Sequence, residues 1–327
     1  MTYRESGVDQ DAADTMVPRL AKHASRTHTI EVVSDLGGFA GLFSLEGVAE
    51  RGFARPALAL STDGVGTKVE LLRRAGEHRT AGWDCAAMSI DDVVCCGAEP
   101  ILFCDYIAIE RLDPDVVEEI VAGVADACTE VGCSLVGGET AQHPGLLVTD
   151  GYDVAGACVG IVDLDRAWGP HRVRERDAVV GLASSGLHAN GYSLVRNVLD
   201  RTGEEPVPDL LVPTAIYARK LLAAAGEVEV HAAAHITGGG IAGNLARAVP
   251  DGLGATIDVS AWPRPPVFGW LAERGVGGQE MAATFNLGIG MALCVPDGVA
   301  CAEALGRLGV QAWVIGQVTG SPGIRLI

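Results

Sequence analysis

The sequence has few basic residues. Of its 327 residues, 24 are Lys or Arg and 42 are Asp or Glu, so the formal net charge is −18. Such a chain repels nucleic acid and anionic membrane surfaces, and we expect neither as a partner. A phosphorylated substrate is repelled as well, unless metal cations or backbone amides receive it.

Long apolar runs and paired cysteine motifs are missing too. No stretch approaches the ~18 apolar residues that a membrane-spanning helix needs. The nine cysteines are an odd number, no two form a CxxC pair, and no signal-peptide pattern is present. We therefore expect free, buried thiols and a cytoplasmic location.

Length and periodicity indicate the fold class. At roughly 100–200 residues per domain, the chain should form two domains. Strand and helix patterns alternate in both halves, which predicts an α/β (α+β) fold. Around residues 163–177 the apolar periodicity lapses and charges accumulate, so we expect domains at residues 1–165 and 166–327. The pattern predicts strands at 56–64, 101–109 and 152–163 and helices at 83–100 and 113–132.

A glycine-rich loop follows the first predicted strand. Its sequence, TDGVGTK, contains Asp63, Gly64, Gly66, Thr67 and Lys68. The glycine spacing and the order of Thr67 and Lys68 differ from a Walker A loop. One interpretation is a plain strand-to-helix turn. The other is a phosphate site, because a carboxylate beside free backbone amides can hold Mg²⁺ against a phosphate.

Acids elsewhere in the first half of the chain could also hold Mg²⁺. Asp91 and Asp92 are neighbours on a predicted helix and point in different directions, so one of them can face the site, and a solvated helix face is the alternative. Glu139 follows a predicted strand that runs into a glycine loop at Gly137 and Gly138. Acids from three element ends could converge on one or two Mg²⁺ ions and offset the charge of a phosphorylated substrate.

A second glycine loop lies in the C-terminal half. Residues 238–243 fit G-x-G-x-x-G, follow a predicted strand and open a helix, and Asp258 lies twenty residues after Gly238. This spacing is typical of dinucleotide-binding proteins and keeps an NAD-dependent oxidoreductase as a hypothesis. The alternative is a helix start whose amides bind any phosphate.

The histidines differ in their surroundings. His188 lies within SSGLHANGYS among small and polar residues, where an acid, a base or a phosphate donor is as plausible as a structural role. His231 and His235 are four residues apart on a predicted strand, and no H-E-x-x-H pattern is present. We therefore expect no zinc site there.

Eleven collinear segments resemble one enzyme family, phosphoribosylformylglycinamidine cyclo-ligase, also called AIR synthetase. The resemblance covers nearly the whole chain. The segments are GVDQDAAD, LGGFAGLF, TDGVGTK, DDVVCCGAEP, DYIA, GCSLVGGETAQHPG, YDVAGACVGIV, SSGLHANGYSLVR, PTAIY, HITGGGIAGNLARAVP and FNLGIGM.

The resemblance implies a fold and an activity. The N-terminal domain would form a β-barrel with its symmetry mate across a homodimer, next to a C-terminal α/β domain, with ATP bound in the cleft between the domains. The family converts formylglycinamidine ribonucleotide to 5-aminoimidazole ribonucleotide, and ATP phosphorylates the amide oxygen. NAD then becomes a remote alternative.

The resemblance also implies residue roles. Asp63 and Asp92 would hold Mg²⁺, Glu139 would assist with the metal or the nucleotide, and Lys68 would contact an ATP phosphate. His188 and His235 are the acid/base candidates. The further nucleotide residues are Gly37, Gly38 and Phe39 in a loop over the nucleotide, with Gly64, Gly66, Thr67 and Thr140. The substrate residues are Ser185, His188, Asn190, Thr237, Gly238, Gly239, Gly240 and Gln142.

The sequence departs from the family pattern at three positions. Gln142 replaces an acid, Ala189 replaces a hydroxyl residue and Ala215 replaces a cation. A related enzyme that uses ATP to activate a different amide or carbonyl substrate therefore remains an alternative. A catalytically weak binding homologue is a third hypothesis, and Asp63, Asp92 and Lys68 argue against it.

Overall fold

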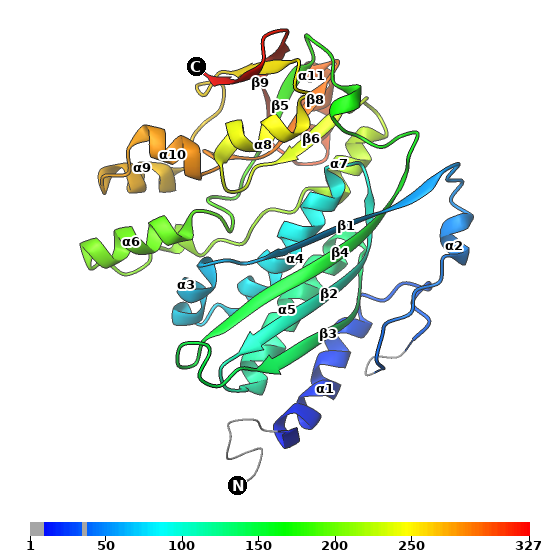
Figure 1. Ribbon diagram of the computed structural model, residues 1–327, viewed down its shortest axis with the longest axis vertical. Helices are drawn as coiled ribbons and strands as arrows, with labels where there is room; N and C mark the ends of the chain where they lie inside the picture. The colour runs from blue at the N-terminus through cyan, green and yellow to red at the C-terminus, as the bar shows by residue number, and fades with distance from the viewer. Residues whose placement is uncertain (1–9, 35–37) are drawn as a thin grey trace. The chain divides into compact units, whose positions relative to one another are not determined.

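The computed structural model describes residues 10–34 and 38–327. Two compact units are present. The first comprises Met1–Val93 and Pro100–Asp165, and the second comprises Val94–Glu99 and Arg166–Ile327. The chain passes from the first unit to the second after Asp165, and residues 94–99 also group with the second unit. Each unit has its own sheet (Figure 1).

The first unit is built on a four-stranded sheet with the order β1-β4-β2-β3. The strands are β1 (Pro56–Gly64), β2 (Glu99–Ile109), β3 (Ser134–Gln142) and β4 (Tyr152–Asp163). β1 runs antiparallel to β4, while β3 runs parallel to β2 because α5 (Pro114–Val131) returns the chain between them. α5 and α4 (His78–Val94) cover one face of this sheet (Figure 1).

The helices of the first unit begin and end at recognisable signals. α5 has Asp113 as its N-cap, whose carboxylate accepts from the backbone N of Asp115 at 3.0 Å, and it ends at Gly132 with φ +77°. α4 begins at His78 rather than at Trp83, and it ends at Val94. The other helices are α1 (Gln10–Ser25), α2 (Glu46–Ala49) and α3 (Lys68–Ala75).

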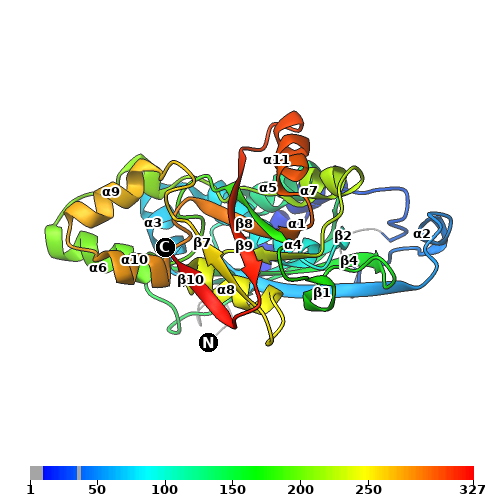
Figure 2. The same cartoon turned by 90° about the horizontal axis from the view of Figure 1, so that it is seen from above.

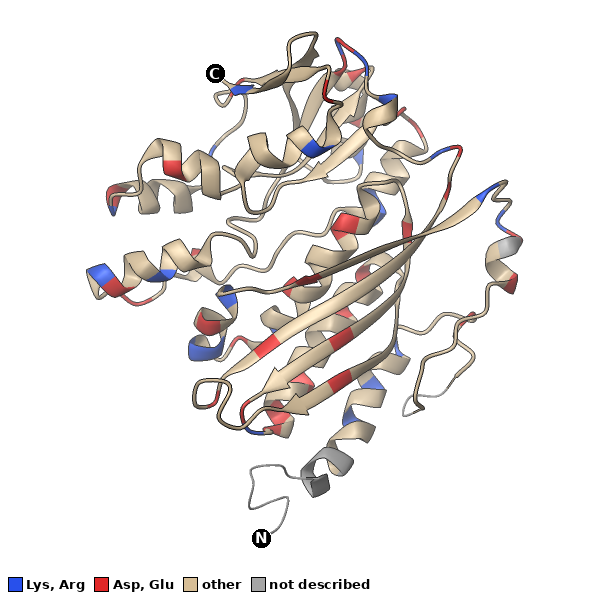
Figure 3. Cartoon of the chain, viewed as in Figure 1, with Lys and Arg blue, Asp and Glu red and all other residues tan. Residues whose placement is uncertain are grey.

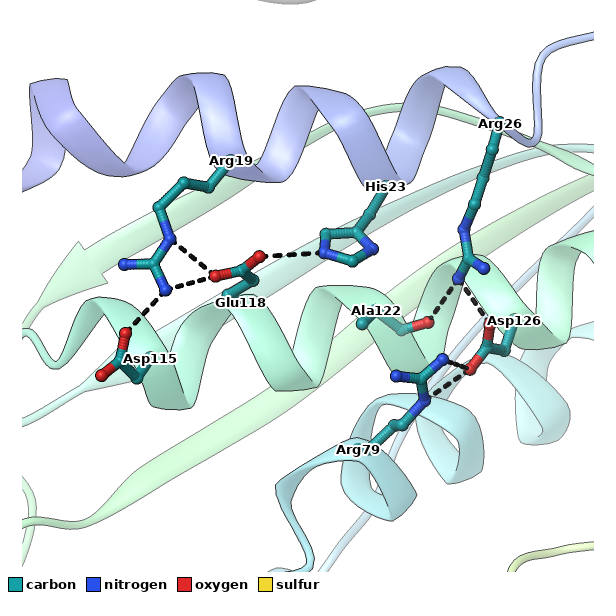
Figure 4. A network of polar contacts seen from close by, with 8 residues as sticks. All are labelled: Arg19, His23, Arg26, Arg79, Asp115, Glu118, Ala122 and Asp126. Carbon is teal, nitrogen blue, oxygen red and sulfur yellow. Dashed lines mark hydrogen bonds and ion pairs between the residues drawn. The ribbon is translucent and has the colours of Figure 1, made fainter.

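Ion pairs hold α1 against α5 (Figure 4). Arg19 Nε donates to Glu118 at 2.6 Å, and His23 Nε2 lies 3.1 Å from the other oxygen of Glu118. These hydrogen bonds, from His23 and from Arg19, hold the pKa of Glu118 below its usual range. Arg26 of the same N-terminal segment and Arg79 of α4 share Asp126. The helix at residues 10–25 is thus docked on α5.

The second unit contains a six-stranded sheet with the order β10-β7-β9-β5-β8-β6. Figure 2 labels β7, β8, β9 and β10 of this sheet. Every residue of β8 is buried, which is typical of a strand covered on both faces. The strands are β5 (Ala178–Ala183), β6 (Ala232–His235), β7 (Gly254–Ile257), β8 (Ile289–Val295), β9 (Ala312–Thr319) and β10 (Gly323–Leu326). The helices are α6 (Tyr192–Thr202), α7 (Ala218–Ala225), α8 (Gly240–Ala248), α9 (Pro266–Glu273), α10 (Gly278–Thr284) and α11 (Gly298–Arg307).

All nine cysteines are free thiols, but three are not buried as expected. Cys104 is exposed because it follows the buried Phe103 on β2 and points to the opposite face of the sheet. Cys95 and Cys96 are half-buried. Within the described part of the chain, no helix is both long and apolar enough to cross a bilayer.

Candidate active site

The end of β1 presents the first glycine loop. Oδ1 of Asp63 accepts a hydrogen bond from the backbone N of Gly64 at 2.7 Å. Gly66 has φ +62°, a conformation that bulky side chains avoid, and α3 begins at Lys68 immediately after Thr67. The structure therefore has a strand, a glycine turn and a helix in the order that the sequence indicates, with a carboxylate at the strand end.

Asp92 lies over the same face of the sheet as Asp63. The hydroxyl of Ser61 donates to Asp92 Oδ2 at 3.1 Å, and Ser61 shares a strand face with Asp63 because the two residues are two positions apart on β1. The neighbouring Asp91 is fully buried, whereas Asp92 is partly exposed. One sheet face thus carries a carboxylate from β1 and another from α4.

Lys68 contacts a buried acid, whereas the sequence predicts that it contacts a phosphate. Its Nζ lies 2.7 Å from Asp84 Oδ2, and both side chains are completely buried. Burial lowers the pKa of Lys68, and the charge of Asp84 opposes this effect. A phosphate contact would require the ammonium group to leave Asp84. The sequence signal that could have revealed this pair is an acid among the apolar positions of α4.

Glu139 lies far from Asp63 within the sheet. β3 and β1 are at opposite edges, three strand spacings or roughly 14 Å apart. Glu139 is exposed beside Tyr106, its partner on β2. Among the described residues, no three His, Cys, Asp or Glu side chains are grouped so as to hold a metal ion. The described chain therefore does not bring Glu139 together with Asp63 and Asp92 as expected.

The expected glycine loop before Glu139 is also wrong. Gly137 and Gly138 lie inside β3, and Thr140 and Gln142 continue the same strand opposite Ile107 and Ile109. In the N-terminal glycine segment, Gly38 is exposed and Phe39 is fully exposed. Gly37 lies outside the described residues.

His188 adopts a strained backbone conformation in the second unit. Its φ is +62° although it is not a glycine, and its side chain is 1% exposed. The backbone N of Ser185 donates to His188 Nε2 at 3.2 Å, and the hydroxyl of Ser185 donates to the carbonyl of Pro213 at 2.6 Å. Strained backbone at a buried titratable residue is typical of functional sites.

Both candidate histidines lie next to β8, at neighbouring positions of this strand. A Cβ at Gly290 would lie 2.4 Å from His188 Cε1 and 2.1 Å from the hydroxyl of Tyr217. His235 pairs with Met291, the next residue of β8, and is also buried. The glycine thus makes room for His188 and Tyr217, and Tyr217 is a neighbour that the sequence did not indicate.

The loop before α8 lies beside the His188 loop. A Cβ at Gly238 would lie 3.7 Å from Asn190 Oδ1, and Gly239 and Gly240 have φ +95° and +64°. The buried amide of Asn244 donates to the carbonyl oxygens of residues 237, 238 and 240, at 3.2, 3.2 and 2.9 Å. Asn244, which sequence reasoning missed, therefore holds these carbonyls toward the protein, the arrangement in which the amides of a helix start can face an anion. Thr237 contributes a hydroxyl that donates to Asn244 at 3.2 Å.

The dinucleotide interpretation of this loop is wrong. In a dinucleotide-binding unit, the strands before and after the glycine loop lie side by side. Here the loop follows β6, Asp258 follows β7, and β8, β5 and β9 separate these two strands. The carboxylate of Asp258 instead accepts from its own turn, from the backbone N of Ser260 at 2.9 Å.

Comparisons with known proteins agree with this architecture. The chain matches the N-terminal domain of AIR synthase related proteins over residues 51–162 and their C-terminal domain over residues 174–327. It is similar in fold to thiamine-monophosphate kinase from Stenotrophomonas maltophilia, with a TM-score of 0.70, 16% identity and 95% of each chain covered. It is also similar to the E. coli hydrogenase maturation protein HypE, with a TM-score of 0.70, 18% identity and 97% and 93% of the two chains covered.

Two relatives are much more similar to this chain in sequence than these solved structures are. A phosphoribosylformylglycinamidine cyclo-ligase from Sorangium cellulosum is 47% identical over 97% of this chain and 95% of the relative. The enzyme of the same name from Myxococcus xanthus is 45% identical over 98% of this chain and 97% of the relative. The chain therefore belongs to the phosphoribosylformylglycinamidine cyclo-ligase family of AIR synthase related proteins.

Proposed function

We propose that this chain is an ATP-dependent cyclo-ligase that converts formylglycinamidine ribonucleotide to 5-aminoimidazole ribonucleotide. The observation that carries the proposal is the alignment with cyclo-ligases at 43–47% identity over nearly the whole chain. The glycine loops and carboxylates described above lie within the aligned range.

The chemistry follows from the bond that must form. An amide oxygen is a very poor leaving group. Transfer of the γ-phosphoryl group of ATP to this oxygen makes phosphate the leaving group. The amidine nitrogen then attacks the activated carbon, a C–N bond forms, and the C–O bond breaks with its electron pair on the departing phosphate. The protein's task is to position two polyanions and offset their charge.

The first unit fits ATP with Mg²⁺. Magnesium takes oxygen ligands, commonly one or two carboxylates together with phosphates and water. Asp63 and Asp92 supply carboxylate oxygens over one sheet face, and acidic side chains are frequent in both units (Figure 3). These two residues would hold the ion, which lowers the charge of the phosphates when bound. The turn at Gly64, Gly66 and Thr67 would offer backbone amides to the nucleotide.

The second unit fits the phosphorylated substrate. The turn from Thr237 to Gly240, held by Asn244, would receive a phosphate through backbone amides. His188, which lies against Gly290 of β8, and His235, which pairs with Met291 of the same strand, would exchange protons with the reacting amide. Ser185 and Asn190 would orient the substrate from the same loop as His188.

We also propose a homodimer in the cytoplasm. Leu58 and Leu60 of β1 and Tyr106 of β2 are exposed on the sheet face opposite the helices. Such an apolar sheet face is stabilised when a second copy covers it. Nine free cysteines fit a reducing compartment.

A related amide substrate is the second candidate. Ala189 is buried directly beside His188, and Gln142 and Ala215 also replace polar or charged family residues. Each replacement removes a group that could contact the substrate, so the preferred amide could differ.

One incubation experiment distinguishes the two candidate functions. The purified chain is mixed with ATP, Mg²⁺ and formylglycinamidine ribonucleotide, and ADP and the imidazole product are quantified together. Equal amounts of ADP and imidazole would support the cyclo-ligase. ADP formation only with another amide would favour the second candidate, and no ADP with any amide would contradict both.

A further inference from the structure

Asp105 is a buried carboxyl group with an unsatisfied oxygen. It lies in the middle of β2 between Phe103 and Ile107, which are buried on the same sheet face. Asp105 is 9% exposed, and its Oδ2 has no hydrogen-bond partner among the described residues. A buried polar atom without a partner is costly, and such atoms in folded proteins commonly have a ligand or a catalytic role.

The neighbouring strand has a glycine that makes room for this carboxyl. A Cβ at Gly138 would lie 1.7 Å from Asp105 Oδ1, a distance that no side chain can occupy. Gly138 does not have a positive φ, so its backbone does not require glycine. By contrast, a Cβ at the adjacent Gly137 would meet nothing within 4 Å. Gly138 is exposed on the edge strand β3, so the carboxyl lies immediately beside the surface.

The chemistry of this position favours a cationic partner. The charge of Asp105 helps to raise the pKa of two thiols, Cys85 on α4 and Cys104 on β2, and neither thiol can neutralise a carboxylate. Among the residues that the structure describes, Asp105 forms no ion pair with Lys, Arg or His, unlike Asp84, which pairs with Lys68. A planar amidinium offers two parallel N–H donors to a carboxylate, the strongest arrangement for such a pair.

We propose that Asp105, whose carboxyl group fills the space beside Gly138, binds the amidine group of formylglycinamidine ribonucleotide and accepts a proton from it during ring closure. The inference rests on the proposed function, which supplies an amidine as the attacking group. It makes Asp105 a catalytic residue, and it gives the DYIA segment a role beside the Gly-Gly pair of β3.

The proton balance of the step is complete with the groups named. The amidine nitrogen attacks the carbon whose oxygen ATP has phosphorylated, and a C–N bond forms. The C–O bond breaks, and its electron pair leaves with phosphate. The proton lost by the amidine moves to the carboxylate of Asp105, and it passes to water after the product has left. Burial raises the pKa of Asp105 to about 7, which suits a proton acceptor near neutral pH.

Three variants of the full chain test this proposal. Asp105→Asn keeps the shape of the side chain but removes the charge and the proton acceptor. Gly138→Ala drives a methyl group into the position of the carboxyl. Gly137→Ala adds the same methyl group one residue away, where the space is open, and is the matched control.

The readouts are kcat and KM for both substrates, the Mg²⁺ concentration for half-maximal rate, and binding of formylglycinamidine ribonucleotide without ATP. In Asp105→Asn and Gly138→Ala we expect kcat/KM for this substrate to fall by about 100-fold or more and its binding to weaken. KM for ATP and the Mg²⁺ requirement should stay within about two-fold of the parent. Gly137→Ala should match the parent, and the acid limb of the parent pH profile near 7 should vanish in Asp105→Asn.

Several outcomes would overturn the proposal. The proposal is wrong if Asp105→Asn keeps nearly the parental kcat/KM. It is also wrong if Asp105→Asn needs much more Mg²⁺ than the parent, because the partner of Asp105 would then be a metal ion. Equal behaviour of Gly138→Ala and Gly137→Ala would also contradict it, and this comparison decides the matter if Asp105→Asn fails to fold. A parent inactive on formylglycinamidine ribonucleotide would refute the proposed function instead, so the two failures are distinguishable.

Discussion

Buried carboxyl groups of the first unit differ in what they contact. Asp163 accepts backbone hydrogen bonds from Ala54 at 2.7 Å and from Asp165 at 3.1 Å. Asp84 is paired with the buried ammonium of Lys68. Asp105 has an oxygen without a partner. The first two arrangements explain how burial of a charge is tolerated, and the third indicates a ligand.

Because Lys68 and Asp84 form a buried ion pair, the effects of substituting them on the free energy of unfolding should be strongly non-additive. Lys68→Met alone leaves Asp84 buried without its cation and should lower the free energy of unfolding by ~3–5 kcal/mol. Lys68→Met combined with Asp84→Leu removes both charges and should recover most of this loss. Urea unfolding of the single and double variants measures both effects. If Lys68 instead contacts an ATP phosphate, the double variant will be stable but will bind ATP much more weakly than the parent.

The raised pKa of Asp105 predicts a pH dependence of stability. The ordinary pKa of this carboxyl is 3.8 and the folded value is about 7, so between these values the folded chain holds a proton that the unfolded chain releases. Stability should therefore fall as pH rises from about 4 to 7. Asp105→Asn should remove this dependence and raise the free energy of unfolding at pH 8, by up to roughly 4 kcal/mol. Thermal unfolding at pH 5 and pH 8 checks this. An Asn variant less stable than the parent at pH 8 would contradict it.

At the scale of elements, the strands were more predictable than the helix starts. β1 and β4 have the predicted bounds because apolar runs end at polar loops. The start of α4 was missed because Gly82 resembles a helix breaker. In the structure, a Cβ at Gly82 would lie 1.8 Å from the carbonyl of Ile120, and one at Gly123 would lie 1.9 Å from that of Arg79. Both glycines therefore allow α4 and α5 to cross in close contact, which one sequence cannot show.

The candidate site was predictable where a motif lies within one loop. Asp63, His188 and the Gly238 loop each lie at the expected strand or helix end. The position of Glu139 was not predictable, because it depends on the strand order, which places β3 and β1 at opposite edges. The partner of Lys68 and the burial of Asp105 likewise depend on which elements pack together.

The β1 loop and α4 are expected to act together on ATP. Asp63→Asn and Asp92→Asn should each lower ATP turnover by orders of magnitude without loss of the fold, because a carboxamide is a poor ligand for Mg²⁺ and neither side chain belongs to the buried core. Asp258→Asn, a strand-end carboxylate with no assigned role, is the control. Normal turnover in both loop variants would show that these acids do not hold the metal.

At the scale of the whole molecule, the exposed sheet face predicts assembly. Leu58 and Leu60 are 63% and 73% exposed on β1, so a second copy should cover them. Light scattering should show a dimer, and Leu60→Asp should convert it to monomers because a charge would be buried at the interface. Val299→Asp, at a 64% exposed position on α11, should remain a dimer. A stable parent monomer of 33.8 kDa that is active on ATP would contradict the prediction.

The central claim is that ATP activates the amide oxygen of formylglycinamidine ribonucleotide. The most direct measurement uses substrate labelled with heavy oxygen in the formyl group, incubated with ATP, Mg²⁺ and the purified chain. Mass spectrometry then locates the label after the imidazole has formed. We expect one heavy oxygen in each inorganic phosphate released, because the C–O bond breaks and the phosphate keeps the oxygen. Label found in water with unlabelled phosphate would contradict the account.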